Sequence, residues 1–385
     1  MDQTSQKKLR KTEYLLLFFV FFVTVGMFWS FFQQESGFTR YEAENTTYEK
    51  ATVREILEQE LVLSGVNHEY FTGYQKVKVC LTQGAGKDTE LVLDNYITLT
   101  HNIVAEEGMH VIICADRPDD IEPYYSIYNY DRSFGITLSI LAFFLLIIII
   151  GKYRGVRAGI GLSFTLAVIL CYMMPELYEG GNEFLAVGMT LVSSCIVSSF
   201  CISGLSIKTV CNMVNTIMGV AAAVFIYFVL TKVFHLHGGS LAEAEMLQLI
   251  SNNTGLSLYG VMFAGIIIGV LGAVMDVAVS QCAALWELKV HNPAMTATQL
   301  LKSGMNIGKD MIGTMINTLI FAFMGGTLPT LFIFISYGVN FQQFLSSDFL
   351  ALELAMGLAG SGAVMLTVPI SAFICGLIFE KGVEI

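Results

Sequence analysis

Long runs of apolar residues dominate the chain on both sides of one polar segment. A helix that crosses a bilayer needs about 20 mostly apolar residues, and eight runs approach that length. They lie at 14–32, 134–151, 158–174, 184–204, 209–231, 256–282, 310–337 and 350–379. The pattern therefore predicts a polytopic α-helical membrane protein with about eight transmembrane helices.

The polar segment covers residues 34–133 and separates the first apolar run from the second. Its stretches Lys76–Leu81, Glu90–Leu93 and Met109–Cys114 alternate or are rich in β-formers, which predicts strands. Val53–Leu63 fits either a strand or a short helix. We therefore expect a small β-rich domain between the first and second helices.

Three regions follow from this pattern. Residues 1–33 hold a basic N-terminus and an apolar helix, residues 34–133 the β-rich domain, and residues 134–385 a seven-helix domain. The first apolar run fits either a cleaved signal peptide or an uncleaved anchor. Its length and the lack of an A-x-A-like site after it favour the anchor.

The distribution of charge predicts the orientation in the membrane. Basic residues concentrate in the expected inner loops, which is the bias of cytoplasmic loops. These residues are Lys152, Arg154, Arg157, Lys208, Lys289, Lys302 and Lys309. We therefore expect both termini in the cytoplasm and residues 34–133 outside it, with the lipid bilayer as the surrounding medium.

Composition strengthens the membrane assignment and excludes other classes. The chain is 54% hydrophobic and only 14% charged, with a mean hydropathy of +0.63. Its net charge is −11, and residues 34–133 carry 18 acidic and 8 basic side chains. A nucleic-acid binder needs clustered Lys and Arg, so we expect no nucleic-acid partner.

Cysteine and histidine give no strong signal for a cofactor. Cys80 and Cys114 each end a predicted strand, and both a disulfide and two buried thiols are compatible with that placement. The other six cysteines lie in or beside apolar runs and are most simply small packing residues. The spacing of His68, His101 and His110 is not typical of a metal site, so no metal or cofactor is expected.

The helix expected at 256–287 carries an ionisable group on a face of small residues. Steps of three and four place seven residues on one helical face. They are Gly265, Gly269, Gly272, Asp276, Ser280, Ala283 and Glu287. Small residues allow another helix to approach closely, so we expect Gly265, Gly269 and Gly272 to pack against a neighbouring helix. Asp276 then faces protein or water and can exchange protons, or it is a structural hydrogen-bond partner.

The following helix carries a second polar face. Asp310, Thr314, Asn317 and Gly325 share it, and Gly325 is a further candidate for helix packing. Asp276 and Lys309 flank the same predicted inner loop, residues 283–309, so an ion pair between Lys309 and Asp276 or Asp310 is geometrically plausible. Residues 291–301 predict a turn followed by a short amphipathic helix on the inner surface.

The stretches GVLGAVMDVAVS and SGMNIGKDMIGTMINTLIFAFMGGTLP, within residues 269–329, resemble the YibE/F family of bacterial membrane proteins. SGLSIKT at 203–209 is similar to that family too, and the resemblance covers roughly 150–380. It implies a bacterial plasma-membrane location, and a shorter member of the same family as a partner. The plan of an anchor, an outer domain and a helix bundle more weakly resembles SecD/SecF and RND-type permeases.

These observations lead to two hypotheses about function. The first is a proton-coupled secondary transporter or permease subunit of unknown substrate, with Asp276 as the protonatable group. Its polar surroundings would be Ser280, Lys309, Asp310, Thr314 and Asn317. The second is a membrane scaffold or sensor that uses its outer domain for recognition, and either form could be a homo-oligomer. We expect no enzyme, because no nucleotide loop, HExxH or nucleophile elbow is present.

Overall fold

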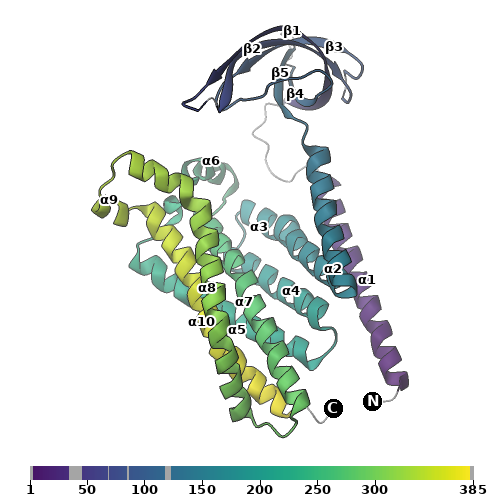
Figure 1. Ribbon diagram of the computed structural model, residues 1–385, viewed down its shortest axis with the longest axis vertical. Coiled ribbons are helices and arrows are strands. Elements are labelled where there is room, and N and C mark those ends of the chain that lie inside the picture. The colour runs from purple at the N-terminus through teal and green to yellow at the C-terminus, as the bar shows by residue number, and fades with distance from the viewer. Residues whose placement is uncertain (1–2, 34–45, 68, 85, 118–122, 382–385) are drawn as a thin grey trace. The chain divides into compact units, whose positions relative to one another are not determined.

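The computed structural model describes the chain except for residues 1–2, 34–45, 68, 85, 118–122 and 382–385 (Figure 1). The chain divides into two compact units. The β unit is Arg40–Leu146, and the helical unit is Met1–Thr39 together with Ile147–Ile385.

Five antiparallel strands form the sheet of the β unit. They are β1 (Thr46–Ser64), β2 (Tyr70–Leu81), β3 (Glu90–Ile97), β4 (His110–Asp116) and β5 (Tyr124–Tyr130). Their order is β3-β2-β1-β4-β5, so β1 is the central strand and pairs with both β2 and β4. Figure 1 shows the strong curvature of this sheet.

The strands predicted at 76–81, 90–93 and 109–114 are confirmed, and Val53–Leu63 is part of a strand.

One face of the curved sheet encloses a core with a polar centre. Val77, Val79 and Val111 are fully buried there, and so is Gln75. The Gln75 amide donates to the Ala105 carbonyl oxygen at 3.0 Å and accepts from the Ala105 backbone N–H at 2.9 Å. Because a buried amide is costly unless it is paired, these bonds let Gln75 fix the 105 loop against the sheet.

The strand order decides the disulfide question for Cys80 and Cys114. Cys80 lies on β2 opposite Thr52, and Cys114 lies on β4 opposite Tyr48. Since β1 separates the two strands, their backbones are about 10 Å apart, which exceeds the reach of a disulfide. The two cysteines therefore do not bridge each other.

The helical unit contains the long apolar helices. Its elements are α1 (Gln3–Gln33), the part of α2 (Ser133–Val168) from Ile147 on, the π-helical turn η1 (Ile169–Met173), α3 (Met174–Tyr178), α4 (Glu183–Ser203), α5 (Ile207–Val233), the 3-10 turn η2 (Gly238–Ser240), α6 (Ala244–Thr254), α7 (Leu258–His291), α8 (Ala297–Ser336), α9 (Phe341–Leu345) and α10 (Asp348–Lys381). Seven helices of the described chain are long and apolar enough to cross a membrane. Each of the eight predicted apolar runs coincides with part of one of them to within two residues.

Two of the predicted runs share one helical stretch, Ser133–Tyr178, of 46 residues. Lys152 interrupts it with non-helical backbone angles, φ 48° and ψ −131°. A straight helix of that length would measure about 70 Å, more than twice the thickness of a bilayer's hydrocarbon core. The break at Lys152 is therefore the point at which this stretch divides into the two predicted segments.

α10 lies at the centre of the bundle. It packs against α5, α7 and α8, while α5 also packs against α4 and α7 (Figure 1). Small residues permit these contacts: a Cβ added at Gly308 of α8 would lie 2.2 Å from Val368 Cγ1 of α10, and one at Gly219 of α5 would lie 2.4 Å from Thr367 Oγ1. The helices can therefore approach closely only because these positions lack a side chain.

The prediction of a separate surface helix after residue 291 is wrong. Thr296 and Gln299 form a capping box that begins α8, and α8 continues without a break to Ser336. The capping box satisfies the first backbone N–H groups of a helix of any length, so this signal marks the start of α8 and says nothing of its end.

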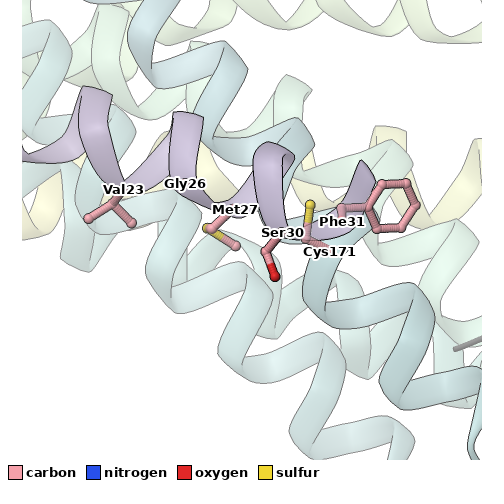
Figure 2. A pocket seen from close by; sticks show the side chains of 6 residues that line it. All are labelled: Val23, Gly26, Met27, Ser30, Phe31 and Cys171. Atoms are coloured by element: carbon pink, nitrogen blue, oxygen red, sulfur yellow. The ribbon is translucent and has the colours of Figure 1, made fainter. Parts of the chain in front are cut away.

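α1 packs against the rest of the helical unit along one side. Leu17 is buried against Phe200 and Cys201 of α4. The Glu13 carboxylate accepts the Leu205 backbone N–H at 2.9 Å, just beyond the end of α4. Farther along, α1 and Cys171 of η1 line an open pocket of about 380 Å³, where Cys171 lies beside α1 (Figure 2).

Candidate functional site

The small-residue face predicted on α7 exists, and it is uncovered. All seven predicted residues are exposed, from Gly265 through Asp276 to Glu287. The residues between them are largely buried, for example Val274, Val277 and Gln281 at 0% exposure. α7 is therefore enclosed on most sides and open along one stripe, which we call the α7 open face.

The predicted packing of glycines on this face is not met within the described chain. A Cβ added at Gly265, Gly269, Gly272 or, on α8, Gly325 would meet no atom within 4 Å. Periodicity correctly places the α7 glycines on one stripe, but a stripe of small residues is equally compatible with a contact inside the chain and with one between chains.

α8 carries the second predicted polar face, and it is also exposed. Lys309, Asp310, Thr314 and Asn317 lie on it, while Gly304 and Gly308 are buried on the opposite side of the helix. The expected ion pair between Lys309 and Asp276 or Asp310 is not formed, since no ion pair in the described ranges includes them. These residues form the α8 open face.

Each open face lies on the side of its helix that is turned away from α10. Gln281 of α7 donates to the Val368 carbonyl oxygen of α10 at 3.1 Å and to the Gly304 carbonyl oxygen of α8 at 3.0 Å. At 100° per residue, Gln281 is about 140° around α7 from Asp276, and Gly308 is about 160° around α8 from Asp310. Both faces therefore point away from α10.

A second group of polar side chains is buried inside the bundle, on α4, α5, α7 and α10. Several of its oxygen atoms have no hydrogen-bond partner among the described residues, which costs about 1–3 kcal/mol for each atom unless water or a solute supplies one. These atoms are Ser194 Oγ, Ser199 Oγ, Asn212 Oδ1, Asn215 Oδ1, Thr216 Oγ1, Gln281 Oε1 and Ser371 Oγ. We call this group the buried polar core. Its oxygen atoms without a partner are suited to hydrogen bonds with water or a polar solute.

Sequence reasoning did not identify this core. The serines of α4 and the polar residues Asn212, Asn215 and Thr216 of α5 are visible in the sequence, but small polar residues in apolar helices most often serve helix packing. Identifying the core requires the tertiary structure. Spacings of three and four residues show which side chains share a helix face, but they do not show which face is enclosed by other helices. Three buried cysteines, Cys211, Cys282 and Cys375, lie next to the core.

A family model described as YibE/F-like protein matches residues 139–381, more than half of the chain. The chain belongs to the YibE/F-like family. No curated protein and no solved structure matches it. The family resemblance stated from sequence is thereby confirmed.

In this YibE/F-like protein, the matched region runs from α2 to the end of α10. It contains both open faces, the buried polar core and the three cysteines, and it excludes α1 and all five strands of the β unit. The family description specifies no activity, so the function has to be inferred from the geometry of the helices.

Proposed function

We propose that this YibE/F-like protein is a permease subunit of the bacterial plasma membrane, in which Asp276 takes up and releases protons. A second copy of the chain covers the α7 and α8 open faces. The long apolar helices cross the bilayer, and the stretch broken at Lys152 crosses it twice. The strands of the β unit lie outside the cell, and both termini lie in the cytoplasm. No enzymatic reaction is assigned to the chain.

The observation that carries the proposal is the exposed carboxyl group of Asp276 on the predominantly apolar helix α7. An ionisable side chain in the middle of a bilayer costs about 2.5–3.5 kcal/mol on insertion scales, so such groups face protein or water. Thr314 and Asn317 on the α8 open face are further exposed polar side chains. A single chain leaves this surface bare, which is why a covering partner is part of the proposal.

A second copy suits this surface because the surface is complementary to itself. Its glycines leave space for an approaching backbone, and two-fold contacts place the same patch against itself. Each copy offers one cation, Lys309, and two carboxylates, Asp276 and Asp310, that form no ion pair within the described chain. Charges of opposite sign are thus available from both sides of the contact.

Proton coupling follows from enclosing Asp276 in this contact. Removing a carboxylate from water favours its neutral form, while a nearby ammonium favours the ionised form. Any conformational change that alters water access or the distance to Lys309 therefore changes its proton affinity, and by linkage protonation favours one conformation. The buried polar core offers the surface along which a polar solute could move.

The contact is tested by cross-linking in membranes. A cysteine placed at Gly269 should form a disulfide-linked dimer on oxidation, whereas one at Val210, exposed on α5, should not. Monomer at both positions would contradict the second copy as the occupant. A cross-link to another membrane protein would instead identify a partner such as a shorter family member.

The proton role is tested in vesicles that contain the purified protein and an internal pH dye. With an imposed pH gradient, Asp276→Asn should reduce proton flux to the level of empty vesicles. Glu287→Gln, on the same face but nearer the helix end, is the matched control and should retain flux. Equal flux from Asp276→Asn and the unmodified protein would refute the role of Asp276, and no flux from either would favour the scaffold or sensor hypothesis.

A further inference from the structure

Three cysteine thiols from three different helices meet in the interior of the helical unit. Cys211 lies on α5, Cys282 on α7 and Cys375 on α10, and each is 0% exposed. Their three sulfur atoms all lie within 4.8 Å of one another, and Cys211 Sγ is 3.3 Å from Cys375 Sγ. The three residues are far apart in sequence, so the fold alone brings them together.

We propose that Cys211, Cys282 and Cys375 bind a d¹⁰ metal ion, Zn²⁺ or Cu⁺, that joins α5, α7 and α10. Metal–thiolate bonds of about 2.3 Å place the sulfurs of a trigonal or tetrahedral site about 3.8–4.0 Å apart. The sulfur separations, from 3.3 Å to within 4.8 Å, bracket that value. Soft thiolates select Cu⁺ and Zn²⁺ over Mg²⁺ or Ca²⁺.

Asn215 supplies an independent indication of a ligand at this point. It is fully buried, its amide nitrogen donates to Cys375 Sγ at 3.3 Å, and its Oδ1 has no hydrogen-bond partner among the described residues. A half-turn of the Asn215 amide would direct this oxygen toward a metal ion held by the three sulfurs, as its fourth ligand. In its present orientation the N–H would instead stabilise the thiolate of Cys375, as hydrogen bonds around a metal centre commonly do.

A backbone oxygen also lies at the edge of the cluster. The Cys282 thiol donates to the Lys208 carbonyl oxygen at 3.7 Å. Tetrahedral Zn²⁺ could therefore complete its coordination with an oxygen, whereas trigonal Cu⁺ needs only the three sulfurs. Each bound thiol loses its proton to solvent as its metal–sulfur bond forms, so binding weakens as the pH falls.

The experiment uses the full chain, purified in detergent under reducing conditions and treated with a chelator. Zn²⁺ is added in one arm and Cu⁺ in another, and bound metal per chain is measured by elemental mass spectrometry after gel filtration. We expect one ion per chain in at least one arm, and the arm that saturates identifies the ion. Co²⁺ offers a spectroscopic check, because thiolate ligation produces an intense near-ultraviolet charge-transfer band.

Variants separate the site from chance binding. Cys282→Ser and Cys375→Ser should each lower the affinity by at least about tenfold. Cys195→Ser is the matched control, because Cys195 is also 0% exposed on a bundle helix but lies outside the cluster, and it should bind as the unmodified protein does. The metal should also raise the unfolding temperature of the unmodified protein and of the control, but not of the cluster variants.

Three outcomes would overturn the proposal. The first is binding of less than one ion per chain in both arms, and the second is equal metal content in the cluster variants and the control. The third is a Cys211–Cys375 disulfide in metal-free protein isolated under reducing conditions. The site does not depend on transport, since metal binding is measured without vesicles or a gradient. Its failure would leave the proposed permease untouched, and the reverse is also true.

Discussion

The contact between α8 and α10 at Gly308 gives the sharpest stability prediction. In Gly308→Ala, the new methyl group would lie 2.2 Å from Val368 Cγ1, where ordinary carbon contacts begin near 3.4 Å. Val368 is β-branched and has one preferred rotamer in a helix, so it cannot turn away cheaply. Overpacking of this kind costs about 1–3 kcal/mol, and the rigid neighbour places it near 3.

Helix propensity acts in the opposite direction. Replacing glycine by alanine within a helix gains about 1 kcal/mol, which leaves Gly308→Ala less stable by about 2 kcal/mol. Gly188 of α4 is the matched control, because a Cβ there would meet no atom of the described chain within 4 Å and only the propensity gain remains. The two variants should therefore differ by about 3 kcal/mol, or roughly 6–12 °C in unfolding temperature.

The measurement is thermal unfolding in detergent, followed by the fluorescence of Trp286, which packs against Phe379 in the same part of the bundle. The unmodified protein should unfold between the two variants. If Gly308→Ala were as stable as Gly188→Ala, α8 and α10 could not be in the close contact described, and the placement of the α8 open face would lose its basis.

Three further predictions concern other parts of the molecule. Hydrogen bonds from the Ser133 hydroxyl, the Lys50 ammonium and the Ser133 backbone N–H lower the pKa of Asp131 from 3.8 to about 2. Ionised Asp131 therefore stabilises the fold by about 1 kcal/mol above pH 4, and this stabilisation is lost as the pH falls toward 2. The difference in melting temperature between the unmodified protein and Asp131→Asn should accordingly disappear between pH 4 and pH 2. Gln281→Leu removes the amide bonds to α8 and α10 and should lower the unfolding free energy by about 1–3 kcal/mol in a denaturant titration, and an unchanged midpoint would refute the described contacts. Peptide mapping without reductant should find no Cys80–Cys114 disulfide even after mild oxidation, and finding one would contradict the central position of β1.

Much of the fold can be predicted from the sequence, because long apolar runs and the alternation of apolar and polar residues along strands are local patterns. The strand at Tyr124–Tyr130 was missed because it buries only Ile127 fully, so it shows no alternation of apolar and polar positions. The merging of two predicted segments into one helical stretch broken at Lys152 could not be predicted, because a single residue in a non-helical conformation leaves no mark on hydropathy.

The candidate site was predictable only in part. Periodicity correctly grouped Gly265, Gly269, Gly272 and Asp276 on one stripe, yet it could not show that the chain leaves this stripe uncovered. The cluster of Cys211, Cys282 and Cys375 was invisible, because each cysteine alone resembles an ordinary small packing residue. Local spacing determines which side chains share a helix face, whereas convergence of three helices depends on their packing.

The central place of α10 has a consequence for biogenesis. α5, α7 and α8 all precede α10 in the sequence, yet each packs against it, and the Gln281 amide donates to a carbonyl oxygen of α10. While the ribosome is still translating residues before 348, the polar groups of α5 and α7 that face α10 lack their neighbour. The nascent bundle is therefore expected to stay loosely assembled, and open to membrane chaperones and proteases, until α10 inserts.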